Sequence, residues 1–255
     1  MPTSEKTLVI VATYNEIENL PRLVEEIFHH APRVDLLVID DNSPDGTGHW
    51  CDKRSDEDPR VRCLHRPDKL GLGTATIAGM RYAMERGYGF VLSMDADFSH
   101  PPGRIPALLQ AMDPPHGQPI DVAIGSRYVA GSRIEGWPLR RRLMSRGVNA
   151  YARWLLGLRT KDCSGAFRCY RTSVLARLDL EKIRSRGYSF FEEILWRLKC
   201  VKAEFAEVPI TFVDRQHGSS KIDAKEAVSA LGTIFLLGMR NWTTAIRIGK
   251  KARDA

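Results

Sequence analysis

Residues 90–102 read Phe-Val-Leu-Ser-Met-Asp-Ala-Asp-Phe-Ser-His-Pro-Pro, and this stretch does most to decide the fold. The apolar run 90–94 is typical of a buried strand in a parallel sheet, and it ends in two carboxylates, Asp95 and Asp97. Two prolines then prevent the strand from continuing. Because open α/β sheets bind ligands outside the carboxyl ends of their strands, the two acids favour a divalent cation that holds a diphosphate. An isolated Asp-x-Asp more often caps a loop, so the interpretation depends on the rest of the chain.

The composition is ordinary for a soluble globular protein. Of the 255 residues, 43% are hydrophobic and 27% are charged, which suffices for one large α/β domain or two small ones. No secretory signal and no apolar run of about 20 residues is visible, so no membrane-crossing helix is expected. The five cysteines are odd in number and lack Cys-x-x-Cys spacing, which predicts neither a disulfide framework nor a zinc site. The expectation is a reduced, cytoplasmic protein.

The net charge of +7 favours an anionic partner without identifying it. Nucleic acid, acidic lipid and a sugar nucleotide are all compatible with this charge. The excess is local, and it includes the run Arg140–Arg142 and a basic tail after residue 239. Apolar residues such as Leu139 and Leu143 flank the arginine run in an amphipathic pattern, which favours a lipid surface. Nucleic-acid binding would instead favour aromatic residues between the basic ones.

The first half of the chain alternates strands with helices, which predicts an α/β fold with a mostly parallel, doubly wound sheet flanked by helices. The predicted strands are Thr7–Thr13, Leu36–Asp40, Val61–His65, Phe90–Met94 and Asp121–Ser126. The predicted helices of this half are Glu16–His30, Gly73–Arg86 and Arg104–Met112. The second half is more helical, with predicted helices Leu139–Leu156, Ser189–Val201 and Ala224–Trp242. We therefore expect one domain over residues 1–222 and a C-terminal extension, an amphipathic helix with a basic tail, over 223–255.

Polar side chains follow the first, second and fourth predicted strands, and the topology should bring these strand ends to one crevice. There Tyr14 offers an aromatic face to a nucleobase and Asp40 an acceptor for a base N–H group. Tyr14 serves equally well as a rim aromatic, and Asp45 is more often a helix N-cap. The segment Lys69–Gly73 precedes a helix and is suited to present N–H groups to a phosphate. It lacks the third small residue of a dinucleotide fingerprint, which argues against a dehydrogenase.

A series of motifs follows in fixed order between residues 7 and 222. They are Tyr-Asn-Glu at 14–16, Asp-Asp-x-Ser-Pro-Asp-Gly-Thr at 40–47, Lys-x-Gly-Leu-Gly at 69–73, Asp-Ala-Asp at 95–97, Gly-Ser-Arg-Tyr at 125–128, Asp-Cys-Ser-Gly-Ala-Phe-Arg at 162–168, Val-Pro-Ile-Thr-Phe at 208–212 and Asp-Arg-Gln-His-Gly-Ser-Ser-Lys at 214–221. The series resembles the inverting GT-A glycosyltransferases of family 2. More closely, it is similar to the dolichol-phosphate (polyprenol-phosphate) mannose synthases, and the order of the motifs makes the resemblance specific.

The resemblance implies transfer of mannose from GDP-mannose to a dolichyl or polyprenyl phosphate, with Mg²⁺ or Mn²⁺ as cofactor. By matching motif, the donor nucleotide would be held by Ala12, Tyr14, Glu16, Asp40, Asp41, Lys69, Asp95 and Ala96. The metal ligands would be Asp95, Asp97 and Ser99. The acceptor and its phosphate would be bound by Arg127, Ser164, Glu193, Arg215, Ser220 and Lys221. The residues expected to act in catalysis are Asp97, Arg127, Arg215 and Lys221.

Three positions depart from the family pattern. Ala12 stands where relatives often have Pro, and Ser99 where some have a metal-contacting Gln. Phe191 replaces a commoner Gln, which puts contacts to sugar or acceptor there in doubt. The expected mechanism is simple, because a phosphate monoester is already anionic at neutral pH and needs no strong general base. The protein's task is then to bring two anions together and neutralise them.

Two other functions stay open. A glucosyl or other hexosyl group could pass from a UDP-sugar to the same lipid phosphate, since Asp40 can accept from guanine or uracil. A basic nucleic-acid-binding module is the more distant alternative. The predicted helix Ala224–Trp242 has apolar residues followed by basic ones. That pattern fits peripheral contact with the cytoplasmic face of a membrane, or docking on a small membrane-embedded subunit, and packing on its own domain is the alternative.

Overall fold

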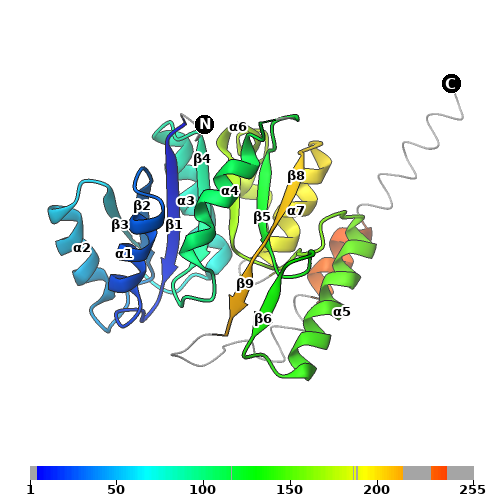
Figure 1. Ribbon diagram of the computed structural model, residues 1–255, viewed down its shortest axis with the longest axis horizontal. Coiled ribbons are helices and arrows are strands. Elements are labelled where there is room, and N and C mark those ends of the chain that lie inside the picture. Colours follow the sequence, from blue (N-terminus) through cyan, green and yellow to red (C-terminus); the bar gives the residue numbers. More distant parts are fainter. Residues whose placement is uncertain (1–4, 116, 186, 188, 215–230, 240–255) are drawn as a thin grey trace, which may run out of the picture.

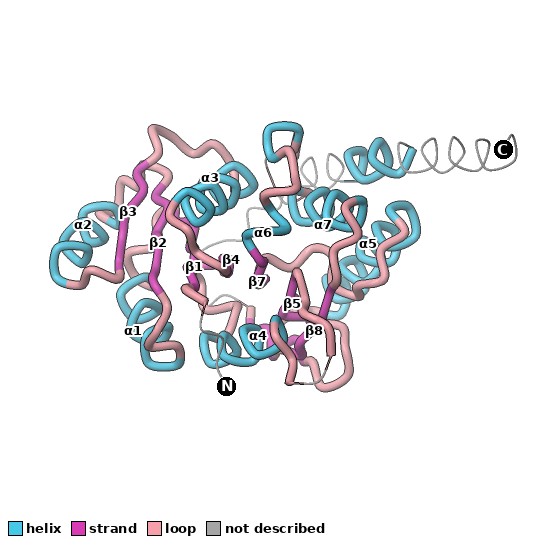
Figure 2. Tube along the Cα trace, turned by 90° about the horizontal axis from the view of Figure 1, so that it is seen from above, coloured by secondary structure: helices cyan, strands magenta, loops and turns pink. Residues whose placement is uncertain are grey.

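The computed structural model of the chain has a seven-stranded sheet with helices on both faces (Figures 1 and 2). It describes all residues except 1–4, 116, 186, 188, 215–230 and 240–255. The strand order is β3-β2-β1-β4-β7-β5-β8. Every neighbouring pair is parallel except those that β7 makes with β4 and β5. The predicted mostly parallel α/β sheet is therefore confirmed.

The strands agree closely with the predicted ranges wherever the apolar pattern was strong. The sheet consists of β1 (Thr7–Thr13), β2 (Asp35–Asp40), β3 (Val61–His65), β4 (Phe90–Asp95), β5 (Val122–Ser126), β7 (Arg168–Arg171) and β8 (Phe205–Pro209). Two short strands, β6 (Arg133–Glu135) and β9 (Thr211–Val213), pair in parallel as a separate ribbon.

The helices cover both faces of the sheet. Because the central strands are therefore buried on both sides, they need apolar residues along their whole length. They are α1 (Leu20–His30), α2 (Thr47–Glu57), α3 (Leu72–Glu85), α4 (Ile105–Met112), α5 (Leu139–Leu156), α6 (Thr172–Leu175) and α7 (Phe190–Cys200), with the 3₁₀ turns η1 (Pro102–Arg104) and η2 (Leu180–Lys182). Alternate residues of β1 point to opposite faces. Val9 and Val11 join a core with α1 and α4, whereas Leu8 and Ile10 join a core with α3, α5 and α7.

Strand β7 was not predicted, because its sequence Arg-Cys-Tyr-Arg begins and ends in a charged residue. Arg168 is nevertheless fully buried. Its guanidinium donates to the carbonyl oxygens of Phe191 at 2.8 Å and of Cys163 at 2.6 Å. Those two bonds compensate the burial of a cation and fasten β7 to the start of α7. An apolar pattern gives no signal for a strand that begins with a buried arginine whose guanidinium bonds to carbonyl oxygens outside the strand.

Helix α1 begins at Leu20, four residues later than predicted. Pro21 stands in its first turn, where the missing N–H group costs nothing. The residues before it form an irregular connection whose N–H groups bond to side chains of the loop after β2. The predicted helix began too early because the spacing of apolar residues does not indicate such long-range hydrogen bonds.

Residues 231–239 are helical, as predicted for the middle of Ala224–Trp242, and the rest of that range lies outside the described residues. Ile234 and Leu237 are buried in the same core as α5 and α7. A Cβ atom on Gly238 would lie only 3.0 Å from Leu155 of α5, so this helix packs closely on the domain. Among the described residues, no helix has both the length and the hydrophobicity that crossing a membrane requires.

Two helical glycines allow a matched test of packing. A Cβ atom on Gly73 of α3 would lie 2.8 Å from the carbonyl oxygen of Ser185 and 2.8 Å from Cβ of Phe190, whereas Gly147 of α5 has nothing within 4 Å. Gly73→Ala should therefore lower the free energy of unfolding by about 1–3 kcal/mol through overpacking. Gly147→Ala should raise it by about 0.5–1 kcal/mol, because alanine favours a helix. Urea denaturation of both variants checks this. Equal effects of the two substitutions would contradict the close packing of α3.

Candidate functional site

The carboxyl ends of three parallel strands lie side by side, as the topology predicted. The register pairs Thr13 of β1 with Asp40 of β2 on one side. On the other side it pairs Ala12 with Asp95 of β4. The sheet therefore brings the two acids to either side of the end of β1. The crevice predicted at this edge rests on that alignment.

The loop after β1 is held by side chains from the loop after β2 and from the first residue of α2. The backbone N–H groups of residues 15, 16 and 17 donate to Ser43 Oγ at 3.0 Å, Thr47 Oγ1 at 3.1 Å and Asp45 Oδ2 at 3.1 Å. Burial opposes ionisation of Asp45, but its bonds from Thr47 and Ile17 outweigh this and lower its pKa. The Ser-Pro-Asp-Gly-Thr motif thus shapes the loop that carries Tyr14 and Glu16.

The two neighbouring acids Asp40 and Asp41 have different partners. Asp40 accepts bonds from Thr13 Oγ1 at 3.0 Å and Ser43 Oγ at 2.6 Å, and it is buried. Asp41 forms a two-bond ion pair with Arg66 at 2.5 and 2.7 Å. Arg66 also donates to Thr74 Oγ1 at 2.8 Å, which connects Asp41 to the start of α3. Binding of a nucleoside by Asp40 and Asp41 stays a prediction, because protein groups already engage both carboxylates.

Tyr14 and Lys69 come from different loops and meet at the rim of the site. The Lys69 ammonium lies 4.6 Å from the centroid of the Tyr14 ring, a cation–π contact. Lys69 is exposed and Tyr14 is half-buried. Two of the predicted donor-binding side chains are thus brought together, next to the glycine-rich entry of α3.

The acids after β4 are surrounded by groups that fit a divalent cation with oxygen ligands. Asp97 is buried, and its Oδ1 accepts the N–H group of Ser99 at 3.1 Å. Ser99 Oγ is buried without a hydrogen-bond partner in the structure. A buried hydroxyl without a partner is rare, and its position two residues from Asp97 fits a third oxygen donor to a cation. The predicted set of Asp95, Asp97 and Ser99 is therefore chemically suited to Mg²⁺ or Mn²⁺.

His100 holds the backbone at the start of the loop that follows β4. Its Nδ1 accepts the backbone N–H of Asp95 at 3.0 Å, so the ring carries its proton on Nε2. Burial lowers the pKa of His100 to about 4, and the ring stacks on Phe167 at 5.3 Å between centroids. The imidazole is neutral and committed to the backbone. It positions Asp95 rather than acting as a general base.

Arg127, predicted to meet phosphate, is held by a buried ion pair with Asp162. Its Nε and Nη2 donate to the two carboxylate oxygens of Asp162 at 2.7 Å each, and Nη2 also reaches Ser164 Oγ at 2.9 Å. Burial disfavours the charge of each partner. The pairing more than offsets this, so it raises the pKa of Arg127 and lowers the pKa of Asp162. The motif at 162–168 indicated this segment, but a role for Asp162 could not be predicted from the sequence.

The neighbouring acids Glu192 and Glu193 of α7 differ in environment. Glu193, predicted to contact the acceptor, is fully buried and accepts bonds from Ser185 Oγ at 2.7 Å and from Arg197 at 2.6 and 2.9 Å. Burial opposes its ionisation, but these bonds lower its pKa. Burial raises the pKa of Glu192 to about 7, and its Oε2 has no hydrogen-bond partner in the structure. A role of Glu193 toward the acceptor stays a prediction, since its carboxylate holds the loop before α7.

A basic depression beside α5 adjoins Arg127. It is lined by Arg127, Tyr128, Val129, Ser132, Arg146, Asn149, Ala150, Arg153 and Lys161. Four of these side chains are cationic at neutral pH. Arg215, Ser220 and Lys221, the other residues predicted to bind phosphate, lie outside the described residues.

The comparison with protein families decides the classification. Residues 8–179 match the model of the family described as Glycosyl transferase family 2. The chain belongs to this family. The resemblance that was drawn from the motifs is confirmed, and the protein is a glycosyltransferase.

Two relatives of this family 2 glycosyltransferase match nearly its full length. A polyprenol monophosphomannose synthase from Mycolicibacterium smegmatis is 42% identical over 238 residues, which cover 93% of this chain and 88% of that protein. An undecaprenyl-phosphate mannosyltransferase from Micrococcus luteus is 44% identical over 217 residues, with 85% of this chain and 87% of that protein covered.

Solved structures confirm the GT-A-like fold of the transferase. A glucosyl-3-phosphoglycerate synthase from Mycobacterium tuberculosis, in complex with Mn²⁺, UDP and glucosyl-3-phosphoglycerate, superposes with a TM-score of 0.62. It is 18% identical and covers 93% of this chain and 80% of its own. A mannosyltransferase from Pyrobaculum calidifontis, in complex with GDP-Man and Mn²⁺, reaches 0.58 at 15% identity, with 96% and 65% covered. At these identities the likeness concerns the fold.

The pKa shifts of the two glutamates of α7 are opposite, so their contributions to stability should respond to pH in opposite directions. The folded-state pKa of Glu192 lies above the ordinary 4.5, so its contribution to stability is lost as pH rises from 4.5 through about 7. The free energy of unfolding of Glu192→Gln should therefore exceed that of wild type by roughly 1–3 kcal/mol between pH 5 and 8. Glu193 has a lowered pKa, so its contribution is present above 4.5 and is lost as pH falls through the lowered value.

Glu193→Gln is the matched control, and it should cost stability throughout pH 5–8. Urea denaturation at four pH values distinguishes the variants. A difference between Glu192→Gln and wild type that stays constant with pH would contradict the raised pKa.

Proposed function

We propose that this glycosyltransferase moves mannose from GDP-mannose to a polyprenyl phosphate and gives polyprenyl-phosphate mannose. The observation that carries the proposal is the similarity to two polyprenyl-phosphate mannosyltransferases at 42% and 44% identity over most of the chain. The site agrees with it, because β4, which leads into the oxygen donors, and β5, which leads into the cationic residues, belong to one sheet. Inversion at the sugar carbon follows from the motif resemblance.

The residues at the end of β4 would bind one Mg²⁺ or Mn²⁺ ion. Asp95, Asp97 and Ser99 are the donors for it, and the bound cation would neutralise the charge of the departing diphosphate. Tyr14 and Lys69 would contact the donor nucleotide at the rim. His100 keeps the backbone of Asp95 in place and stays neutral, so it contributes no charge to the site.

The acceptor phosphate would bind near Arg127. The ion pair with Asp162 orients the guanidinium, and Arg146, Arg153 and Lys161 of the same depression add positive charge. An anionic acceptor arrives ready to attack, so the protein has to hold it rather than deprotonate it. Arg215, Ser220 and Lys221 remain proposed contacts to phosphate on the same grounds as in the sequence analysis.

Peripheral binding at the cytoplasmic face of a membrane would bring the enzyme to its acceptor. On α5, Leu139, Leu143, Met144 and Trp154 are exposed, at 71%, 57%, 56% and 68%. The helix 231–239 adds exposed Leu231, Phe235, Leu236 and Met239. Arginines at 140, 142, 146 and 153 stand on α5 among the apolar residues, a combination that suits an anionic lipid surface.

A transfer assay tests the function and its alternative together. The protein is incubated with Mg²⁺ or Mn²⁺, a polyprenyl phosphate in vesicles and either labelled GDP-mannose or labelled UDP-glucose. We expect label in the lipid extract from GDP-mannose. Label from UDP-glucose alone would favour the alternative donor, and label from neither would refute the assigned acceptor.

Loss of Asp97 should abolish transfer. Asp97→Asn removes the negative charge that a cation at this site needs, so the rate should fall by about 10²-fold or more, and excess EDTA should do the same to wild type. Asp56→Asn, at an exposed position of α2, is the matched control and should retain full activity. Normal turnover by Asp97→Asn would rule out the cation site after β4.

The apolar residues of α5 should govern lipid binding. Leu143→Ser combined with Trp154→Ser should reduce the partition onto anionic vesicles by roughly tenfold or more, because two exposed apolar side chains no longer enter the lipid. Leu70→Ser is the control, since Leu70 is also exposed, at 47%, but lies just before α3 and so belongs neither to α5 nor to the helix 231–239. Equal flotation of both variants would show that α5 does not face the membrane.

A further inference from the structure

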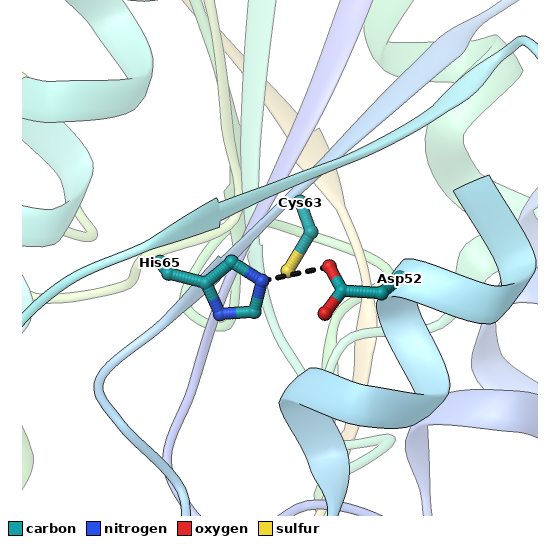
Figure 3. Close-up of side chains that lie close together, drawn as sticks. All are labelled: Asp52, Cys63 and His65. Atoms are coloured by element: carbon teal, nitrogen blue, oxygen red, sulfur yellow. Dashed lines mark hydrogen bonds and ion pairs between the residues drawn. The ribbon is translucent and has the colours of Figure 1, made fainter. Parts of the chain in front are cut away.

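Three side chains with different donor atoms converge at the β3 edge of the sheet (Figure 3). They are Asp52 of α2 and Cys63 and His65 of β3. A carboxylate oxygen, a thiol sulfur and an imidazole nitrogen all lie within 4.8 Å of one another. His65 Nε2 and Asp52 Oδ1 are 2.7 Å apart and form a hydrogen bond. Neither the proposed transfer reaction nor the sequence motifs use any of these residues.

The fold creates this cluster from residues that are distant in the sequence. Residues two apart on a strand share a face, so Cys63 and His65 both point toward α2. Gly48 makes room for the imidazole, since a Cβ atom there would lie 3.1 Å from His65 Cε1. Asp52 stands one helical turn after Gly48, which brings its carboxylate to Nε2.

The donor set selects the kind of cation. A thiolate and an imidazole are ligands of Zn²⁺ and related transition metals, whereas Mg²⁺ and Ca²⁺ take oxygen ligands. Tetrahedral zinc with bonds of about 2.0–2.3 Å separates its ligand atoms by roughly 3.3–3.7 Å. Donor atoms that already lie within 4.8 Å of one another require only small side-chain movements to reach these separations. Since Asp52 and His65 are exposed at 55% and 49%, their hydrogen bond can open and admit an ion from solvent.

We propose that Asp52, Cys63 and His65 bind one Zn²⁺ ion, with water as the fourth ligand. The cysteine spacing of the sequence does not point to this site, because helix α2 supplies one ligand and strand β3 supplies the other two. Zinc would fasten the edge strand β3 to α2. Strands β2 and β1 separate it from β4, so it is distinct from the cation site at Asp95 and Asp97.

One feature of the metal-free protein opposes zinc binding, and another affects how the binding is measured. The neighbouring Cys51 thiol and burial raise the pKa of Cys63, so zinc has to displace a proton from sulfur. Cys51 and Cys63 are both free thiols, and Cys51 Sγ donates to the carbonyl oxygen of Arg62, the residue next to Cys63, at 3.9 Å. A phosphine reductant is therefore needed in any measurement, to keep the two sulfurs from oxidising.

Cobalt is the probe that separates this site from the oxygen site. The full-length, metal-stripped protein is titrated with Co²⁺, and the thiolate-to-cobalt charge-transfer absorption is followed. We expect this absorption to saturate at one equivalent of bound cobalt and to vanish when Zn²⁺ is added. An oxygen-only site cannot produce it, so wild type without the absorption would overturn the proposal.

Variants then assign the ligands. Cys63→Ser should abolish the charge-transfer absorption, and His65→Ala should weaken cobalt binding by roughly tenfold or more. Cys200→Ser, which removes an exposed thiol on α7, and Cys51→Ala should both retain it. Circular dichroism confirms that each variant is folded, and the exposed His65 provides the test if Cys63→Ser does not fold. Retention of the absorption by Cys63→Ser, or its loss in Cys200→Ser or Cys51→Ala, would show that the sulfur ligand is not Cys63.

Discussion

The parallel pairing of β1 with β2 on one side and with β4 on the other is the constraint on which the rest of the molecule depends. Its register places Asp40 beside Thr13 and Asp95 beside Ala12. A shift of one residue would exchange the two faces of β1 and remove its valines from their core. The same hydrophobic burial that stabilises the sheet therefore determines which polar side chains meet at its edge.

Two pairs of opposite charges near this edge are engaged with one another. Asp41 pairs with Arg66 and Asp162 with Arg127, and each pair makes two hydrogen bonds with little exposure to water. Buried ion pairs of this kind recover the cost of desolvation only when their geometry is good, so they contribute orientation more than stability. The transferase thereby holds the charged groups of these two pairs in fixed orientations near the strand ends.

The sequence predicted what depends on local pattern. The five apolar strands, the helix Leu139–Leu156 and the convergence of three strand ends followed from periodicity and topology, and motif order revealed the family. Strand β7 escaped because the buried Arg168 bonds to carbonyl oxygens outside the strand, one of them Phe191, 23 residues away in the sequence. The pairing of Arg127 with Asp162 escaped for the same reason, since spacing along the chain does not report which cation finds which anion.

Gly48 of α2 lies next to two different parts of the molecule. A Cβ atom there would lie 2.9 Å from Asp40 Oδ2 and 3.1 Å from His65 Cε1. Asp40 belongs to the crevice at the strand ends, and His65 to the cluster at the β3 edge. A side chain at position 48 would press on both groups, so a single substitution there would disturb both places at once.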